Sequence, residues 1–412
     1  MTDRAPSLFL RARPLPSGQG TSLENPPAAR PKGPVRRCVM LDRYQQQQGK
    51  MMADTVAVDR DALQAFTTKV SREVLGGLNC ALTFVGDQLG LFKAMAELGP
   101  TNSEALSEHL GLSERWVREW LYQQACTHHI EYDESTSTFS LSPEASIVLA
   151  TPEHPAYLGG MLHSVTAMYE TLGDLPESFR TGLGQSYDAK GESCACGIER
   201  MSKKFQSDHL VPDLLPRLDG IVGKLEAGAQ VADVGCGAAT STVAMGRAFP
   251  DSAFSAYDIS VNALARAKGN IDASGLSNIR LCNSDHDPLP EDGSLDLVTT
   301  FDVIHDSTHP RELIRAIRRS LRDDGTWLCA DIRGGSSFEE NLRENPFAGM
   351  AYSFSVLVCM SSGLSVPDGA GLGTLGFHEQ KAREMSEAEG FSRFRLVEYE
   401  GDQFNAFYEI RP

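Results

Sequence analysis

Residues 230–240 read Gln-Val-Ala-Asp-Val-Gly-Cys-Gly-Ala-Ala-Thr, and this stretch gives the strongest indication of the fold class. Its apolar part, which ends at Val234, is typical of a buried parallel strand. Gly235 and Gly237 come next, and glycine permits a tight turn and the close approach of a ligand where a Cβ would clash. Residues 238–249 then have helical character and stop before a proline. The sequence thus predicts a strand, a glycine turn and a helix in succession.

An acidic residue completes this unit. Residues 253–257 form a second apolar run, which delivers Asp258 about twenty residues after the glycines. Strand, glycine turn, helix, strand and acid make a nucleotide-binding half-unit, in which the acid accepts hydrogen bonds from a ribose diol. A dinucleotide site usually has a third glycine, but Thr240 occupies that position. Because a glycine turn alone also occurs in other α/β proteins, the assignment depends on the strands downstream.

The remaining strands of a sheet are predicted after Asp258. Three further strands and a closing antiparallel pair are expected at 279–282, 295–301, 327–331, 394–399 and 404–410. Residues 310–321 carry apolar side chains at helical spacing. Ligands of such sheets bind beyond the carboxyl ends of the strands, where the strand order reverses. The polar residues that come directly after the predicted strands fall at this edge.

The pattern Asp-x-Gly-x-Gly, which begins at Asp233 and is followed by small residues and a later acid, resembles the first two motifs of class I S-adenosylmethionine (SAM)-dependent methyltransferases. The resemblance implies an α/β fold with a Rossmann-like, seven-stranded methyltransferase domain, and SAM as the cofactor. It also implies that Asp233 or a nearby carbonyl helps to hold the α-amino group of SAM, that Asp258 holds its ribose and that Asp285 meets its adenine. The expected cofactor contacts are Asp233, Gly235, Cys236, Gly237, Asp258, Ile259, Asp285, His286 and Asp302, with a structural alternative for His286.

The end of the fourth strand carries the candidate catalytic residues. His305 lies just past this strand, where the resemblance places the methyl group, and we predict that it acts as a general base. Asp306 beside it is expected to orient the imidazole or to raise its pKa. A structural histidine remains the alternative. We expect no metal, although His309 lies nearby, because no further acid pair supports a divalent site.

The amino-terminal part resembles a winged helix. Residues 103–110 and 113–121 are predicted to be two helices, with Ser103 and Ser113 as N-caps, and a small hairpin is expected at 130–132 and 138–141. DNA binding requires a basic face, but residues 91–150 contain three Lys or Arg against nine Asp or Glu. We therefore expect this domain to serve packing or dimerisation and do not expect nucleic acid as a partner.

A long apolar helix is predicted before it, at 66–91. Its apolar residues recur at helical spacing and fit a subunit interface as well as they fit the core of one chain. They are Val70, Val74, Leu78, Leu82, Val85 and Leu89. A homodimer formed through the amino-terminal domain is consistent with the first interpretation.

Composition bounds the remaining possibilities. The chain has 412 residues, a net charge of −17 and no apolar run long enough for a membrane span. Nine scattered cysteines suit a reducing compartment, and the pair Cys194-x-Cys196 is interpreted as a loop feature. Residues 1–50 carry nine Lys or Arg and three acids, a composition typical of a disordered leader. We expect a cytoplasmic protein; the alternative is that this leader directs import into an organelle.

These observations lead to one functional prediction. We expect a disordered leader at 1–55, a winged-helix domain at 56–150, a helical linker and lid at 151–215 and a SAM-binding domain at 216–412. The predicted activity is methyl transfer to an O, N or S atom of a small-molecule acceptor. The alternative is a winged-helix transcriptional regulator that senses SAM or another ligand without catalysis, against which the acidic winged helix argues.

Overall fold

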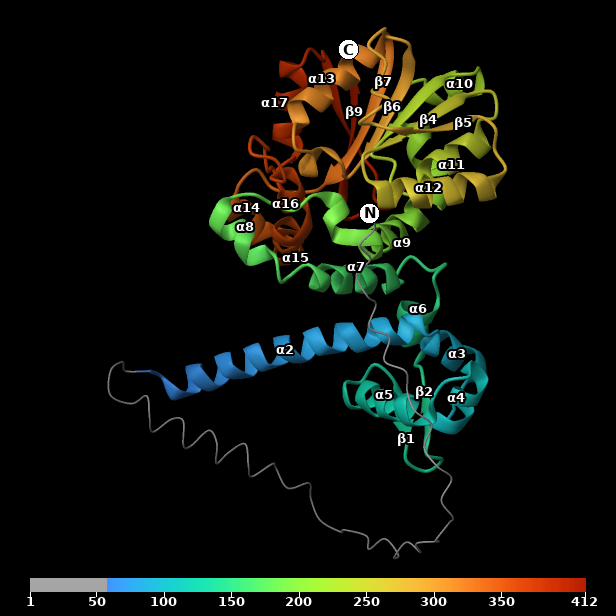
Figure 1. Ribbon diagram of the computed structural model, residues 1–412, viewed down its shortest axis with the longest axis vertical. Coiled ribbons are helices and arrows are strands. Elements are labelled where there is room, and N and C mark those ends of the chain that lie inside the picture. The colour runs from blue at the N-terminus through green and yellow to red at the C-terminus, as the bar shows by residue number, and fades with distance from the viewer. Residues whose placement is uncertain (1–57) are drawn as a thin grey trace, which may run out of the picture. The chain divides into compact units, whose positions relative to one another are not determined.

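The computed structural model describes residues 58–412, so the expected leader at 1–55 lies outside the described residues. Among the described residues, Val70–Pro412 form one compact unit. The largest element of this unit is a sheet of seven strands in the order β5-β4-β3-β6-β7-β9-β8 (Figure 1). The strands are β3 (Gln230–Val234), β4 (Ala253–Asp258), β5 (Ile279–Asn283), β6 (Leu295–Phe301), β7 (Leu321–Ile332), β8 (Arg393–Val397) and β9 (Asn405–Arg411).

The predicted Rossmann-like sheet is confirmed. Strands β3 to β7 are parallel, and β9 is antiparallel to both of its neighbours. The chain builds β4 and β5 outward from β3 and then returns to place β6 on the other side. The order therefore reverses between β3 and β6, and their carboxyl ends meet at the switch point where such sheets bind ligands. The start of β7 differs most from the prediction: the strand begins at Leu321, because this residue already pairs with Leu295 before an irregularity in the ladder.

Helices cover both faces of the sheet (Figure 1). They are α10 (Ile221–Glu226), α11 (Thr240–Ala248) and α12 (Val261–Ser274) on one face, and α13 (Pro310–Ser320) and α17 (Glu379–Ala388) on the other. Side chains alternate along β3, so Val231 packs with the cluster that contains Met245 of α11, whereas Ala232 packs with the cluster that contains Ile314 of α13. Burial on both faces explains the nearly continuous apolar strands of the sequence.

The winged helix also forms. It consists of α3 (Leu91–Leu98), α4 (Ser103–Leu110), α5 (Glu114–Cys126), the hairpin β1 (Glu131–Asp133) and β2 (Thr138–Ser140), and α6 (Pro143–Ala150). The predicted N-cap Ser103 is wrong: Asn102 caps α4 by accepting from the Ala105 N–H at 2.9 Å, and Ser103 donates to Glu114 at 2.6 Å. Ser113 precedes α5 but its side chain makes no capping hydrogen bond.

Two groups of helices complete the described chain. Residues 159–217 form α7 (Gly159–Glu170), α8 (Leu175–Thr181), η1 (Tyr187–Lys190), α9 (Gly191–Asp208), η2 (Leu210–Leu214) and η3 (Leu215–Arg217). After β7 come α14 (Phe338–Glu344), α15 (Ala348–Phe354), the π-helical turn η5 (Ser355–Cys359) and α16 (Met360–Gly363). The loop interpretation of Cys194 and Cys196 is wrong, because both lie within α9.

Helix α2 (Arg60–Gln88) precedes the winged helix. Within residues 58–412 no single helix is long and apolar enough to cross a membrane, and α2 with α3, bent by 66°, meets the criterion only as a pair and only by length and composition. The predicted apolar face of α2 is partly exposed to solvent and partly packed against the winged helix. Val74 and Leu78 are 62% and 59% exposed, whereas Leu82 packs against the core of the winged helix.

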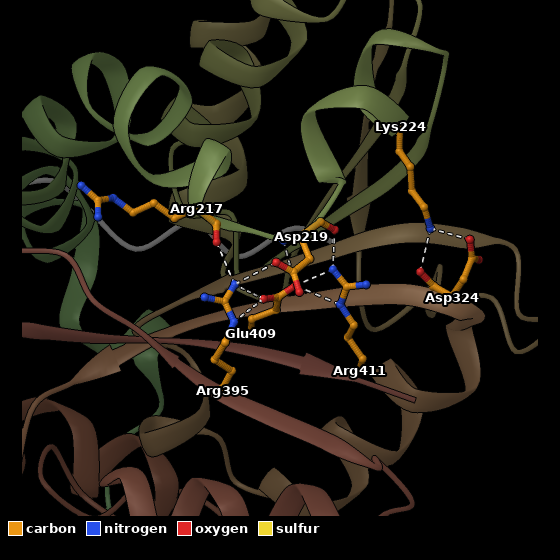
Figure 2. Close-up of polar contacts among 7 residues, drawn as sticks. All are labelled: Arg217, Asp219, Lys224, Asp324, Arg395, Glu409 and Arg411. Atoms are coloured by element: carbon orange, nitrogen blue, oxygen red, sulfur yellow. Dashed lines mark hydrogen bonds and ion pairs between the residues drawn. The ribbon is translucent and has the colours of Figure 1, made fainter.

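An ion-pair network around the buried Glu409 holds the closing strands of the sheet (Figure 2). Glu409 of β9 is 3% exposed and accepts from Arg395 Nε at 2.8 Å, from Arg411 Nε at 2.9 Å and from the Asp219 backbone N–H at 3.1 Å. Arg395 also donates to the Arg217 carbonyl at 2.7 Å. The network thus ties β8 and β9 to the segment that leads into α10.

Candidate active site

The turn after β3 contains two glycines whose surroundings differ. Gly235 and Gly237 have φ values of +68° and +56°, which favour glycine. A Cβ added to Gly235 would lie 2.3 Å from Cγ2 of Val303, whereas one added to Gly237 would meet no atom within 4 Å. The expected cofactor contacts of the two glycines stay predictions, but the space beside each of them differs. Gly235 makes room for Val303 of the protein itself, and only Gly237 borders open space.

Asp258 faces this turn. Its Oδ2 accepts from the Gly237 N–H at 2.8 Å, and its Oδ1 accepts from the Ser260 N–H at 2.8 Å. Burial raises the pKa of this carboxyl, and the two backbone hydrogen bonds oppose that shift. Each carboxylate oxygen can accept a second hydrogen bond, so the arrangement has acceptor capacity left for two ribose hydroxyls. The structure thus brings together Gly237 and Asp258.

Asp233 lies inside the protein and does not face the turn. The side chain is 1% exposed and accepts from the hydroxyls of Ser241, Thr242 and Thr299 at 2.6, 2.5 and 2.7 Å. Burial raises the pKa of its carboxyl. The expected direct contact with an amino group is corrected accordingly, because these hydrogen bonds join β3 to α11 and β6. Cys236 is 5% exposed, so it can reach a ligand only through its backbone.

The expected adenine side of the site is open to solvent. Ile259, directly after Asp258, is 59% exposed. The Ser284 N–H donates to the Asp258 carbonyl at 2.9 Å, which brings the loop after β5 beside the end of β4. In this loop Asp285 and His286 are both exposed. The structure therefore places the predicted adenine contacts on one edge, where their side chains are free to meet a base.

Asp302 has an unusual backbone. Its φ is +58°, rare for a residue other than glycine, and such strain is concentrated at functional sites. Asn405 donates to its Oδ2 at 3.3 Å, while Oδ1 is buried with no hydrogen-bond partner among the described residues. Burial, with Asp331 nearby, raises the pKa of Asp302 to about 7. This carboxyl therefore has hydrogen-bonding capacity that the protein leaves unused.

His305 is paired differently from the prediction. It lies in the short turn η4 (Ile304–Asp306), and its Nδ1 is 2.6 Å from Oδ1 of Asp331 at the end of β7. Asp331, not the adjacent Asp306, therefore orients the imidazole, because strands β6 and β7 are neighbours and their carboxyl ends meet. Burial opposes the charge on His305, but Asp331 and the contact with Cys359 outweigh it and raise its pKa well above the ordinary value. The ring is 2% exposed.

Asp306 stays close to this pair and is partly exposed. Burial raises its pKa to about 7, while the charge of His305 lowers it and the charges of Asp331 and Asp258 raise it further. Within residues 58–412 no group of three or more His, Cys, Asp or Glu is arranged to hold a metal ion. The site therefore contains two carboxyls with pKa values near neutrality, Asp302 and Asp306, beside a histidine.

Two contacts from the linker helices have no counterpart in the sequence pattern. Asp188 of η1 accepts from Ser260 Oγ at 2.6 Å and from the Val261 N–H at 3.1 Å, at the start of α12. Glu199 of α9 accepts from Arg266 Nε at 2.7 Å. These contacts join segments about 70 residues apart in sequence, so no spacing signal announces them. They attach η1 and α9 to the helix that follows the cofactor acid.

Two residues whose types would suit ligand contacts prove structural. Phe205 is partly buried and packs its ring against Tyr399 and Phe407 of the core cluster, with centroids 5.9 and 5.5 Å away. Asn341, in the segment after β7, is 3% exposed and holds the Gly335 backbone.

Comparisons with known proteins agree with this geometry. Residues 225–390 match the family model described as a methyltransferase domain, and residues 77–151 match the one described as an Rv2258c-like winged HTH domain. No curated protein sequence matches the chain.

Solved structures share the fold over most of the chain. Human N-acetylserotonin methyltransferase in complex with SAM is 18% identical, with 87% of this chain and 99% of that chain covered and a TM-score of 0.60. The mitomycin 7-O-methyltransferase MmcR is 18% identical, with 86% and 99% covered and a TM-score of 0.62. PigF with SAH is 15% identical, with 84% and 99% covered and a TM-score of 0.62.

At these identities the likeness to solved structures shows the fold, and the family models supply the domain type. The methyltransferase model covers the glycine turn, Asp258 and the end of β6, and the winged-helix model covers the helices before them. The chain therefore carries a methyltransferase domain, with the fold of class I SAM-dependent methyltransferases, preceded by an amino-terminal winged-helix domain.

Proposed function

We propose that this protein transfers the methyl group of SAM to an O, N or S atom of a small-molecule acceptor. The observation that carries the proposal is the turn at Gly237, which borders open space and whose N–H is held by the Asp258 carboxylate at 2.8 Å. At such a turn the protein backbone can approach a cofactor closely, and the acid beside it can accept hydrogen bonds from a ribose diol. The N-acetylserotonin and mitomycin methyltransferases act on small molecules by their titles, which supports the acceptor class.

The chemistry asks little of the protein beyond alignment. SAM is an activated sulfonium whose methyl group is transferred by in-line displacement, with a neutral thioether leaving. Holding the acceptor lone pair in line with the methyl group can contribute about 7–11 kcal/mol. Residues at the carboxyl ends of β4 and β6, namely Asp258 and Asp302, would hold the cofactor, and the η4 turn would face the acceptor.

A protonated acceptor also needs a base, and we propose His305 for this role. Asp331 holds its Nδ1, so the opposite nitrogen is the one that takes the proton, and the resulting imidazolium is stabilised by the carboxylate. Asp306 is the second candidate, since it is partly exposed and its pKa of about 7 suits proton transfer at neutral pH.

The proposal is tested with methyl-labelled SAM. The purified full-length protein is incubated with labelled SAM and a metabolite extract of the source organism, and labelled products are identified by mass spectrometry. We expect a labelled small molecule that is absent with the Asp258→Ala variant. Binding of SAM without transfer to any component would contradict the catalytic proposal and favour a ligand-sensing protein.

A further inference from the structure

Lys190 is a buried cation without a counter-ion. It ends η1, is 2% exposed, and donates to Oε1 of Gln185, its one hydrogen-bond partner among the described residues. No carboxylate of residues 58–412 lies within ion-pair distance of its ammonium group, and burial lowers its pKa. An ammonium group has three donors, and burying its charge without an anion is costly. The lysine therefore has donors and charge to spare.

The groups around Lys190 supply no stable negative charge. Burial raises the pKa of the Cys194 thiol, one turn along α9, to about 11, so it stays neutral. Burial also raises the pKa of Tyr187 well above its ordinary value, so the phenol stays protonated and remains a donor. The acid that acts on Lys190 from a distance is Asp174, which is exposed to solvent.

Tyr187 lies on the same face of η1 as Lys190. Side chains at i and i+3 of a 3₁₀ helix are eclipsed, and these two residues have that spacing. The Tyr187 ring packs against Met168, Val358 and Cys359, and no hydrogen bond joins its hydroxyl to a residue of 58–412. Asp188, between them in sequence, accepts hydrogen bonds from Ser260 and Val261 at the start of α12.

Tyr187 lies near the proposed active site. The charges that act on Tyr187 include Asp306 and the cofactor acid Asp258, and Cys359 contacts both the Tyr187 ring and His305. The segment is fixed in place from the other side, because the Gln185 N–H donates to Ser361 Oγ of α16 at 2.9 Å. Cys359 thus links the Tyr187 ring to the histidine that would receive the acceptor's proton, and Gln185, the partner of Lys190, is fixed to α16, which packs beside η4.

We propose that Tyr187 and Lys190 form an anion subsite and that the methyl acceptor is an organic acid. Its carboxylate would pair with the Lys190 ammonium and accept from the Tyr187 hydroxyl, while its nucleophilic atom faces Asp306 and His305. The inference rests on the proposed methyl transfer and names the acceptor class of that same site. An anion subsite also explains why Lys190 is buried, because burying its charge without a counter-ion would lower the free energy of unfolding.

The test separates acidic from neutral acceptors. Metabolites of the source organism are divided by anion exchange at pH 8 into retained and unretained pools, and each is incubated with the full-length protein and methyl-labelled SAM. We expect label only in products of the retained pool, and loss of that label when its carboxylates are first converted to primary amides. Label only from the unretained pool overturns the inference but leaves methyl transfer standing. No label from either pool refutes methyl transfer, and the inference with it.

Variants locate the effect at the subsite. Lys190→Met should lower kcat/KM for the retained acceptor by about tenfold or more, mainly through KM, with the dissociation constant of SAM unchanged. The matched control is Lys203→Met, which removes an exposed lysine of α9 and should change neither quantity. Tyr187→Phe removes only a hydroxyl without a protein partner, so it should fold normally and raise KM in the same direction. Unchanged KM values in folded Lys190→Met or, should that variant not fold, in Tyr187→Phe overturn the inference.

Discussion

Among single residues, Asp258 holds the glycine turn and has acceptor capacity left for a ribose. Asp258→Ala should weaken SAM binding by about 1.5–3 kcal/mol, the usual size for a hydrogen bond to a charged group. Titration calorimetry with SAM measures the change. The control is Asp251→Ala, an exposed acid before β4 and thus at the opposite edge of the sheet. An unchanged dissociation constant for Asp258→Ala would refute the ribose assignment.

The pairing of His305 with Asp331 predicts a pH dependence. The imidazole must be neutral to accept a proton, and Asp331 raises its pKa, so kcat/KM should rise with pH through a value above 6.5. Asp331→Asn removes the carboxylate, which should shift this rise to lower pH and reduce the maximal rate. His305→Ala should lower kcat by about 10²–10⁴-fold with little change in SAM affinity. A pH profile that moves with Asp306→Asn instead would assign the base to Asp306.

Asp302 predicts an effect on stability. Its folded-state pKa is about 7 against an ordinary 3.8, so the folded chain binds this proton more tightly than the unfolded chain. Its contribution to the free energy of unfolding is therefore lost as the pH rises from 3.8 to about 7. Asp302→Asn should make the unfolding free energy fall less steeply over this range, by about 1 kcal/mol per pH unit. Denaturant unfolding at several pH values checks this, and parallel profiles for both proteins would contradict it.

Among the structural elements, the turn after β3 contains one glycine that matters mainly for stability and one that matters mainly for SAM binding. Gly235→Ala adds a Cβ that clashes with Val303 at a positive φ, and should lower the free energy of unfolding by about 2–4 kcal/mol. Gly237→Ala faces open space and should cost about 1–2 kcal/mol from φ alone, while it weakens SAM binding. Thermal unfolding and calorimetry separate the two effects. Val303→Ala should partly restore the stability of Gly235→Ala and not affect Gly237→Ala.

For the molecule as a whole, the exposed apolar residues of α2 predict self-association. Val74 and Leu78 expose 62% and 59% of their area, one turn apart on one face, and exposed apolar stripes of this kind mark interfaces. We expect the full-length protein to sediment as a dimer in analytical ultracentrifugation. Val74→Asp with Leu78→Asp should shift it toward the monomer without loss of helicity. Lys93→Asp, on the exposed side of α3, is the control.

Local sequence patterns were sufficient to predict the sheet and its cofactor edge. The strands, the glycine turn and Asp258 are such patterns, because a buried parallel strand and a positive φ each leave a mark within a few residues. The helices of the winged helix are predictable for the same reason. The cap at Ser103 failed because the neighbouring Asn102 offers an equally good acceptor, and a choice between adjacent residues depends on backbone angles.

Which side chains meet could be learned from the folded chain alone. Asp331 orients His305 because β6 and β7 are neighbours, although 26 residues separate the two side chains. Gly235 is required by Val303, and Asp188 is fixed by Ser260, each through contacts between distant segments. The unbalanced charge of Lys190 leaves no mark in the sequence, since burial arises only when η1, α9 and α16 pack together. The local sequence pattern determines whether a segment forms a helix, a strand or a turn. Electrostatic partners and close packing depend instead on which segments the topology brings side by side.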